Sequence, residues 1–509
     1  MGSRKDSLMN IAPDTVDTRT LQLLQQASEH LNDHHAYLVG GSVRNLLLNE
    51  PCTDWDIVTS GDAPRLARQL ANKLGGHYAY LHDKASRITI KDGEQHILLD
   101  IAPQHGKTIE ADLHERDFTI NAIAIPLSNL IAHLTSNETL QLIDPSHGAA
   151  DIAACQIRAV NNYVFKHDPL RMLRAVRFMA CYDLTIENRT AQMIMRDAPL
   201  LTCSATERIR EELYTILKPQ GGTARLRFLN QHGLFTTLIP EFIVARDMPQ
   251  PSLHYWDVLE HSLESVGTLE YLATLLQQSA EQLRASHLNT GNEDNLVTLQ
   301  ALLREAEQQG IFSFAALTTP TMKMAALLHD IGKTTTYTVD EEGTIRFYHH
   351  PQAGVPLAQQ IMRRLSTSTH DRRLVQQVVA HHMRPGQLSN DTVTQRAIRR
   401  YFVDLGPAGI YVALVSLADH LAMRGPQPLT DAWTKHLTTV RLLLACYIRE
   451  REKILPPRLL QPEELMRKLN LAPGPLIGEL LESIAEAQAE GRVHSKDDAL
   501  WLAEERLHK

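Results

Sequence analysis

Aromatic residues, long apolar runs and paired cysteines are scarce or missing in this sequence. Aromatic residues make up only 5% of the 509 residues. No segment approaches the ~20 consecutive apolar residues of a membrane-spanning helix, and the first ten residues lack the apolar core of a secretory signal. The five cysteines show no C-x-x-C spacing, which favours reduced thiols over a disulfide framework. We therefore expect a soluble, cytoplasmic protein with no membrane partner.

Positive charge is also in deficit. The chain has 51 Lys and Arg against 59 Asp and Glu, a formal net charge of -8. A nucleic-acid partner would therefore need local basic patches, because the neutralisation of phosphates drives such binding. Hydrophobic residues form 43% of the chain and lie in short periodic runs. This pattern favours helices, and the length favours about three or four domains.

The apolar pattern changes near residue 150. Before this point, short β-rich runs predict strands at 36–39, 55–58, 86–90 and 97–102, with periodic helices at 43–48 and 63–74. After it, helical spacing dominates. We predict an α+β fold in four regions: a small mixed α/β head at 20–150, then mostly α-helical regions at 151–250, 251–425 and 426–509. The polar stretch 278–298 is expected to be a long loop, and the last region two or three helices split at Gly474-Pro475.

Two acids stand on a predicted strand, in the sequence DWD. Asp54 and Asp56 are two residues apart and therefore project to the same face. Adjacent like charges are costly without a cation. Carboxylates are ligands that Mg²⁺ prefers in phosphoryl and nucleotidyl transfer. A solvent-facing turn is the alternative interpretation.

The segment GGSVR precedes these acids. Gly40 and Gly41 allow backbone N–H groups to approach a phosphate closely, and the helix that follows offers its positive end. Arg44 can add a fork-shaped contact to phosphate oxygens. The combination with the acid pair favours a metal and phosphate site over a simple turn.

Further motifs follow in order: ERDFTINAIA (115–124), DPLRMLRAVRF (168–178) and TERIREEL (206–213). With GGSVRN and DWD, they resemble the class II tRNA nucleotidyltransferase/poly(A) polymerase family over roughly residues 36–215. The resemblance implies that Asp54 and Asp56 hold the catalytic metals. It also implies nucleotide contacts from the remaining matched positions: Gly41 and Arg44 at the triphosphate, Arg116 and Asn121 at nucleotide and sugar, and Asp168 and Arg171 at the base edge.

Three further residues between positions 36 and 215 are candidates for the nucleotide-binding or catalytic site. Arg174 and Arg177 share a helix face beyond the base-reading pair, which favours nucleotide binding over a solvated face. Asp100, at a predicted strand end, is either a third catalytic carboxylate or a structural support. The chain departs from the family at Asn45, usually aspartate, and at His167, usually glutamate, which leaves its nucleotide preference open.

Histidines concentrate between residues 254 and 425. Imidazoles and carboxylates that converge from separate helices suit divalent transition metals. The series resembles the HD phosphohydrolase domain, which implies hydrolysis of a phosphomonoester or cyclic phosphodiester with Mn, Ni, Co, Fe or Mg bound. Packed histidines or a metal-free HD scaffold are the alternatives. The implied ligands are His261, His329, Asp330 and Asp419, with His350 and His382 for a second metal and Lys333 for a phosphate.

The resemblance therefore implies an enzyme that adds CTP, with ATP as an open second substrate, to the 3′ end of tRNA. Mg²⁺ in the head is the implied cofactor. A poly(A) polymerase, a non-catalytic tRNA-binding protein and a protein active only at the HD domain are the rivals. The C-terminal helices either contact tRNA or cap the fold, and the oligomeric state stays open.

The connection after Asp100 bears on which nucleotides are added. Relatives that add a complete CCA carry a mobile loop there, before the RDFTINA helix. In this chain about ten residues separate Asp100 from the helix-leading acids Glu110 and Asp112, and Pro103 stiffens them. We predict partial addition, with CC favoured over A. Alternatively, Lys107 and its neighbours do the same work in compact form.

Overall fold

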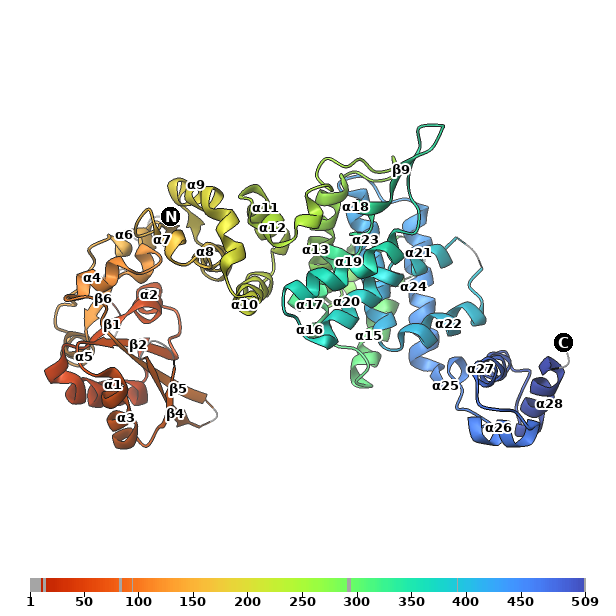
Figure 1. The fold of residues 1–509 in the computed structure, drawn as a ribbon, viewed down its shortest axis with the longest axis horizontal. Coiled ribbons are helices and arrows are strands. Elements are labelled where there is room, and N and C mark those ends of the chain that lie inside the picture. The colour runs from red at the N-terminus through yellow and green to blue at the C-terminus, as the bar shows by residue number, and fades with distance from the viewer. Residues whose placement is uncertain are drawn as a thin grey trace. The chain divides into compact units, whose positions relative to one another are not determined.

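The computed structural model describes residues 11, 15–81, 85–93, 95–290, 294–390 and 392–507. The first ten residues, on which the expected absence of a signal depends, lie outside these ranges. The chain divides into two compact units, Met1–Ile216 with Leu229–Leu238, and Leu217–Phe228 with Ile239–Lys509. Figure 1 shows both, and each is described by itself.

The first unit begins with a six-stranded mixed sheet in the order β3-β4-β5-β2-β1-β6. Only β2 and β5 run parallel. All four predicted strands are confirmed, whereas the first and last strands of this order had no clear sequence signal. The strands are β1 Tyr37–Val39, β2 Asp54–Thr59, β3 His77–Tyr80, β4 Ser86–Asp92, β5 Gln95–Pro103 and β6 Ala124–Pro126.

Helices with apolar faces cover this sheet. In α3 (Ala63–Leu74), Asp62 caps the first turn by accepting from the Arg65 N–H, and Gly75 ends the helix with a φ of 68°. Its apolar face packs on β4 and β5. The other helices here are α1 Thr18–Leu31, α2 Gly40–Leu48 and α5 Leu127–Ser136, with the 3₁₀ turn η2 Asn32–His34.

The RDFTINA segment does not form the expected helix. It contains one 3₁₀ turn, η3 (Thr119–Asn121). The backbone before that turn is held extended, since Phe118 forms a β-bridge with Ala159 and the Thr119 N–H donates to the Arg158 carbonyl at 2.9 Å. The helix that follows β5 is instead α4 (Ile109–His114), so Glu110 and Asp112 lie within it.

The rest of the first unit is helical apart from a two-stranded parallel sheet, β7 (Gln156–Ile157) with β8 (Thr185–Ile186). The division between the units runs through α11. The helices are α6 Gly148–Ala153, α7 Val164–His167, α8 Arg171–Tyr182, α9 Asn188–Asp197, η4 Ala198–Cys203, α10 Thr206–Leu217, α11 Gly222–Gln231 and α12 Leu234–Leu238.

The second unit is built on helices packed around α13 (Val258–Leu275), α17 (Pro320–Leu328) and α23 (Ala408–Arg424). A hairpin, β9 (Tyr337–Val339) with β10 (Ile345–Phe347), interrupts them. The remaining elements are η5 Pro240–Phe242, α14 Ala280–Ala285, α15 Asn295–Gln308, α16 Phe314–Leu317, α18 Lys333–Thr336, α19 His350–Arg364, α20 Thr369–His381, α21 Met383–Leu388, α22 Gln395–Leu405, α24 Asp431–Arg449, α25 Arg451–Ile454, α26 Pro462–Leu469, α27 Pro475–Ala489 and α28 Lys496–Leu507.

The structure tests two sequence predictions for this unit, the loop at 278–298 and the C-terminal helices. The expected loop at 278–298 is wrong in part, because α14 forms within it. Ser279 and Gln282 build a capping box that satisfies the free N–H groups of this short helix. The C-terminal helices are confirmed, with α27 beginning at Pro475.

No single helix in the described ranges has the length and composition of a membrane span. The pair Gln395–Leu405 and Ala408–Arg424 passes only when the two are taken together, and it is bent by 107°.

Candidate functional site: a charged cavity in the first unit and a histidine cluster

The two acids of the DWD motif share one face of β2. Asp54 is exposed and Asp56 is half-buried, while Trp55 between them is only 2% exposed. This is the alternation that the sequence predicted. The parallel neighbour β5 places Asp100 in register with Asp56. Three carboxylates therefore gather across two adjacent strands.

Asp100 differs from the other two acids because it has a cationic partner. Arg87 lies opposite it on β4. The Arg87 guanidinium donates two hydrogen bonds to the carboxylate, Nε to Oδ1 at 2.8 Å and Nη2 to Oδ2 at 2.7 Å. Such a bidentate pair fixes the orientation of a carboxylate. Arg87 thus holds the Asp100 carboxylate in one orientation beside Asp56.

The turn into α2 brings the backbone against Asp56. Gly40 has a φ of +65°, and a Cβ there would lie 2.9 Å from Arg116 Nη1 and 3.4 Å from Asp56 Oδ2. Glycine is therefore required at this position. Ser42 ties the turn to β2, since its Oγ accepts from the Asp56 N–H at 2.7 Å and donates to the Asp54 carbonyl at 3.0 Å.

Arg44 is only 6% exposed, and protein groups engage its guanidinium. It donates to Asn121 Oδ1 at 2.6 Å, Asn45 Oδ1 at 2.9 Å and the Tyr182 hydroxyl at 2.7 Å. Its Cζ also lies 4.4 Å from the Tyr182 ring centroid and 5.0 Å from that of Phe178. Arg44 thus joins α2 to α8, and the phosphate contact expected from sequence would require some of these bonds to rearrange.

Asp168 and Arg171, which were predicted to read the base edge, hydrogen-bond to other groups and not to each other. Asp168 Oδ2 accepts from Arg208 at 3.1 Å, and Asp168 Oδ1 accepts from the Leu170 N–H at 3.1 Å. Arg171 donates to the backbone carbonyl of Glu115 at 2.9 Å. These contacts orient both side chains along the cavity wall. Sequence reasoning assigned no role to Arg208, although it lies in the TERIREEL motif.

Two further arginines of α8 are held by acids that the sequence analysis overlooked. Arg174 Nε donates to Asp117 Oδ2 at 2.8 Å, and Arg177 Nη1 donates to Glu212 at 3.2 Å. Asp117 also accepts from Asn121 at 2.9 Å. Burial raises the pKa of Asp117, but Arg174 and Asn121 outweigh it and hold the pKa below the usual range. Both acids stand inside quoted motifs, which was the available signal.

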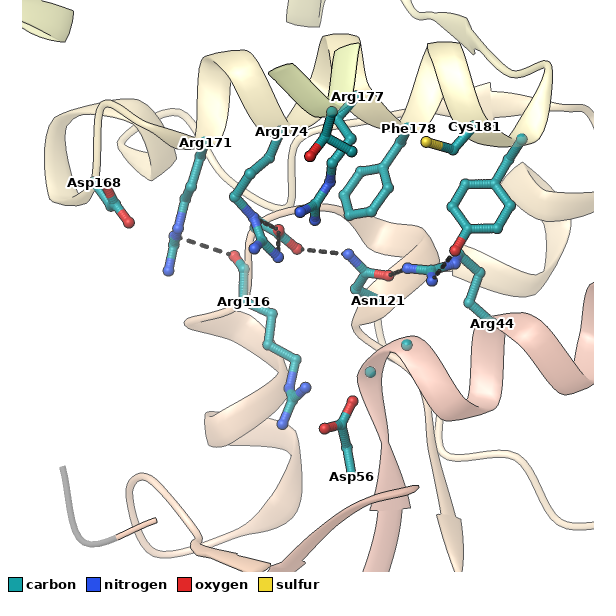
Figure 2. A pocket seen from close by; sticks show the side chains of 15 residues that line it. Arg44, Asp56, Arg116, Asn121, Asp168, Arg171, Arg174, Arg177, Phe178 and Cys181 are labelled. Carbon is teal, nitrogen blue, oxygen red and sulfur yellow. Dashed lines mark hydrogen bonds and ion pairs between the residues drawn. The ribbon is translucent and has the colours of Figure 1, made fainter. Parts of the chain in front are cut away.

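These side chains surround one cavity of about 600 Å³ (Figure 2). All nine residues predicted to bind the nucleotide line it, together with Asp56 of the DWD motif. The lining residues are Gly40, Gly41, Arg44, Asp56, Arg116, Asp117, Asn121, Asp168, Arg171, Arg174, Arg177, Phe178, Cys181, Tyr182 and Thr215.

The charge balance at Asp56 fits a bound cation. Burial raises its pKa, as do Asp100 and Asp54, whereas Arg116 and the Gly41 N–H lower it, and the result is about 6. The positive charge of Arg116 compensates this carboxylate only in part, and a divalent cation would supply the rest.

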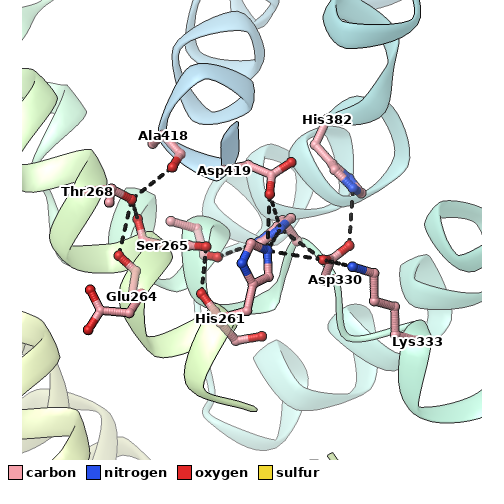
Figure 3. Close-up of polar contacts among 12 residues, drawn as sticks. His261, Glu264, Ser265, Thr268, Asp330, Lys333, His382, Ala418 and Asp419 are labelled. Carbon is pink, nitrogen blue, oxygen red and sulfur yellow. Dashed lines mark hydrogen bonds and ion pairs between the residues drawn. The ribbon is translucent and has the colours of Figure 1, made fainter. Parts of the chain in front are cut away.

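A second cluster lies in the second unit, built from separate helical segments (Figure 3). The His261 and His329 Nε2 atoms are 3.3 Å apart. His261 Nε2 lies 3.0 Å from Asp419 Oδ1 and 3.3 Å from Asp330 Oδ2. The candidate ligand atoms of these four residues all lie within 4.8 Å of one another, which permits a common metal ion.

Asp330 belongs to a second candidate group as well. Its other oxygen, Oδ1, lies 3.1 Å from His350 Nε2 and 3.3 Å from His382 Nε2. The two imidazole nitrogens are 3.4 Å apart. Asp330 can therefore bridge two metal ions, and all six predicted ligands are brought together.

Backbone carbonyls orient three of these imidazoles. The Nδ1 atoms of His329, His350 and His382 lie 2.7, 3.0 and 3.0 Å from the carbonyls of Ala326, Phe347 and Val379. A carbonyl requires a donor at Nδ1, which leaves the lone pair of Nε2 directed at the cluster. This is the usual arrangement for metal-binding histidines.

Lys333 lies beside the cluster. Its Nζ is 2.6 Å from Asp330 Oδ2 and donates to Gln250 Oε1 at 2.7 Å. It also lines an adjacent cavity of about 460 Å³. Its ammonium group therefore lies where it could contact a phosphate bound in this cavity, as the sequence analysis expected. This cavity is also lined by Asp330, His350, His382 and Asp419.

Comparison with known families gives three matches. Residues 36–158 match the poly(A) polymerase head domain, residues 315–424 match the HD domain, and residues 183–245 match the "Probable RNA and SrmB-binding site of polymerase A". His261 precedes the HD match, yet it lies among the HD ligands. The chain thus combines a nucleotidyltransferase head with an HD domain.

Similar whole chains agree with these matches. An A-adding tRNA nucleotidyltransferase of Deinococcus radiodurans is 29% identical over 91% of this chain and 94% of its own length. A CC-adding tRNA nucleotidyltransferase of Thermus thermophilus is 29% identical over 91% and 92%. Over about nine tenths of its length, the chain is therefore similar to tRNA nucleotidyltransferases.

Solved structures show the same fold. A CCA-adding enzyme in its apo form I matches with a TM-score of 0.63 at 22% identity, covering 99% of this chain and 97% of that one. Other matching structures are described as complexes of CCA-adding enzymes with ATP, with CTP and with tRNA.

Proposed function

We propose that the chain adds nucleotides to the 3′ end of tRNA, with CTP as substrate and ATP as an open second substrate. The observation that carries the proposal is the cavity that the head and the region after it line together. It joins Asp56, an acid suited to a metal ion, to Asp168 and Arg171, which can pair with a base edge (Figure 2). In this proposal, 20–150 is the catalytic head, 151–250 and 426–509 hold RNA, and 251–425 is a second centre.

The reaction is a displacement at the α-phosphate. The 3′-hydroxyl oxygen of the RNA forms the new P–O bond, the bond to the β-phosphate oxygen breaks, and pyrophosphate leaves. Asp54 and Asp56 would hold Mg²⁺, which supplies positive charge to the attacking and leaving oxygens. Arg116, held by the buried Asp112 at 2.9 Å, lies near Asp56 and can orient phosphate oxygens.

Base selection would depend on the wall formed by α8. Asp168 can accept a hydrogen bond from a base, and Arg171 can donate one. Because Arg208 and the Glu115 carbonyl hold these two side chains, the wall is already formed in the protein. Protein groups then take the part that a template strand plays in other polymerases.

The connection between β5 and α4 supports partial addition. β5 ends at Pro103 and α4 begins at Ile109, so only residues 104–108 join them. So short a segment cannot act as a long mobile lever, which favours a single nucleotide mode. We therefore propose that the chain adds CC and leaves the terminal A to another enzyme.

The products test this proposal. Incubated with CTP and ATP, a tRNA that ends at the discriminator base should accumulate ends in CC, read by sequencing the RNA. Efficient formation of full CCA ends, or addition of A alone to a tRNA that already ends in CC, would contradict it. A poly(A) primer in place of tRNA distinguishes a poly(A) polymerase, and no incorporation into either RNA would leave only the other rivals.

A second activity is favoured by the bridging position of Asp330. Two adjacent metal ions suit hydrolysis of a phosphomonoester or cyclic phosphodiester, and imidazole with carboxylate favours Mn, Ni, Co or Fe over Mg. Lys333 would contact the phosphate in the neighbouring cavity.

A further inference from the structure

The region 151–250, here called the neck, has a surface that combines an exposed aromatic ring with cations and shares no residue with the cavity described above. This surface is formed by Tyr163, Lys166, Arg189 and Arg196, from α7 with the residue before it and from α9. We name these four residues the neck patch. They line a hollow of about 510 Å³.

The charges of the neck patch are poorly compensated. Within the described ranges, Lys166 and Arg189 have no carboxylate at ion-pair distance. Arg189 instead donates to Asn162 Oδ1 at 2.8 Å, and Arg196 donates to the Asn162 carbonyl at 3.2 Å. Arg196 alone has an acidic partner, Asp197 at 2.5 Å. Asn162 thus holds two arginines together without cancelling their charge.

This is unusual in a chain with a net charge of -8. Like charges held near one another repel, so the arrangement costs stability unless an anion occupies the space between them. A polyanion such as an RNA backbone offers several phosphates along one strand.

The aromatic ring indicates what kind of polyanion fits. Tyr163 is 61% exposed, and the Lys166 Nζ lies 5.9 Å from its ring centroid. An exposed ring beside cations is the arrangement on which single-stranded nucleic acids stack their bases. A duplex keeps its base faces covered and cannot use such a ring.

We propose that the neck patch binds an unpaired segment of RNA, with a base stacked on Tyr163 and phosphates against Lys166, Arg189 and Arg196. This rests on the proposed function, because the RNA is taken to be the substrate that receives nucleotides. Arg189 and Arg196 lie inside the matched RNA-binding segment, which begins at residue 183. Tyr163 and Lys166 lie outside both this segment and the head match, which ends at 158.

Binding of RNA to the full chain, followed by fluorescence anisotropy over a range of salt concentrations, tests the proposal. The probes are a labelled single strand of about twelve nucleotides and its blunt duplex. The double variant Lys166→Ala with Arg189→Ala should lower the slope of log K against log salt by roughly 1.4 for the single strand, about 0.7 for each lost phosphate contact. The matched control, Arg65→Ala with Lys91→Ala, removes two exposed cations of the head, away from the neck patch, and should leave the slope unchanged.

Substitutions at Tyr163 test the stacking of a base on its ring separately from the phosphate contacts. Tyr163→Ala should weaken single-strand binding by roughly tenfold, as expected for one stacked base, whereas Tyr163→Phe should keep it. In nucleotide addition, the patch variants should raise the KM for tRNA and leave kcat and the KM for CTP unchanged. Equal binding of duplex and single strand, or no effect of Tyr163→Ala, would overturn the proposal.

Failure of the proposed function would look different. If the wild-type chain adds no nucleotide to any tRNA but the patch variants still weaken single-strand binding, the proposed reaction is contradicted and the RNA-binding role of the neck patch is supported. If nucleotide addition proceeds and the patch variants leave the KM for tRNA unchanged, only the proposed role of the neck patch is contradicted.

Discussion

The Asp56→Asn variant is expected to lose nucleotide addition and yet unfold at a higher temperature than the wild type when Mg²⁺ is absent. The loss of activity follows from the loss of a metal ligand. The gain in stability follows from the raised pKa of Asp56, about 6 in the folded protein against 3.8 for an ordinary aspartate. An acid with a raised pKa is destabilising wherever it is ionised.

The sign and the pH window follow from this shift. Below pH 3.8 Asp56 is protonated in both states and contributes no difference. Between pH 3.8 and 6 Asp56 is ionised in the unfolded state but protonated in the folded state, so folding must take up a proton. Above pH 6 folding must place the ionised carboxylate in a disfavoured position, which costs at most about 3 kcal/mol at 1.36 kcal/mol per unit of pKa. The stabilisation by Asn should therefore be largest above pH 6 and disappear near pH 4.

Thermal unfolding at pH 4 and pH 8, with and without Mg²⁺, measures this effect. Mg²⁺ should raise the melting temperature of the wild type at pH 8 and have little effect on Asp56→Asn, because ligand binding stabilises only the state that binds. Asp54→Asn is the matched comparison. It removes a charge from the same face but at an exposed position, so it should lose activity with a smaller gain in stability. Near-wild-type incorporation by Asp56→Asn would contradict the metal assignment.

The sequence could predict those features of the head site that depend only on residues close together in the chain. The alternation in DWD determines that Asp54 and Asp56 share a face, and two glycines before a helix indicate a close backbone approach. The pairing of Asp100 with Arg87 depends on the register of β4 against β5, which no local pattern contains. The direction of Arg44 depends likewise on Tyr182, a residue 138 positions away.

The fold shows the same limit. Strands with strong apolar runs were predicted correctly, whereas β3 and β6 are short and weakly patterned. RDFTINA became an extended segment and one turn because Arg158 and Ala159 pair with its backbone, a tertiary contact that outweighs local propensity. The histidine cluster was found only through its resemblance to HD domains, since His261 and Asp419 come from segments far apart in the chain.

The Asp330→Asn variant is expected to lose bound metal from both candidate groups and to abolish phosphohydrolysis while sparing nucleotide addition. Asp330 supplies Oδ2 to the group of His261 and His329 and Oδ1 to the group of His350 and His382, so one substitution weakens both. Asparagine keeps an acceptor for the buried Lys333, which avoids leaving that ammonium without a partner.

Elemental analysis of the purified chain, beside assays of both activities, measures the outcome. His382→Ala is the matched comparison, because it belongs to the second group alone and should remove one metal ion and leave the other. Nucleotide addition should stay at the wild-type rate in both variants, since the head motifs and the HD ligands lie in different compact units. Equal loss of both activities would mean that the two regions act as one site or one folding unit. A wild-type chain that retains no divalent metal would instead make the cluster a metal-free scaffold.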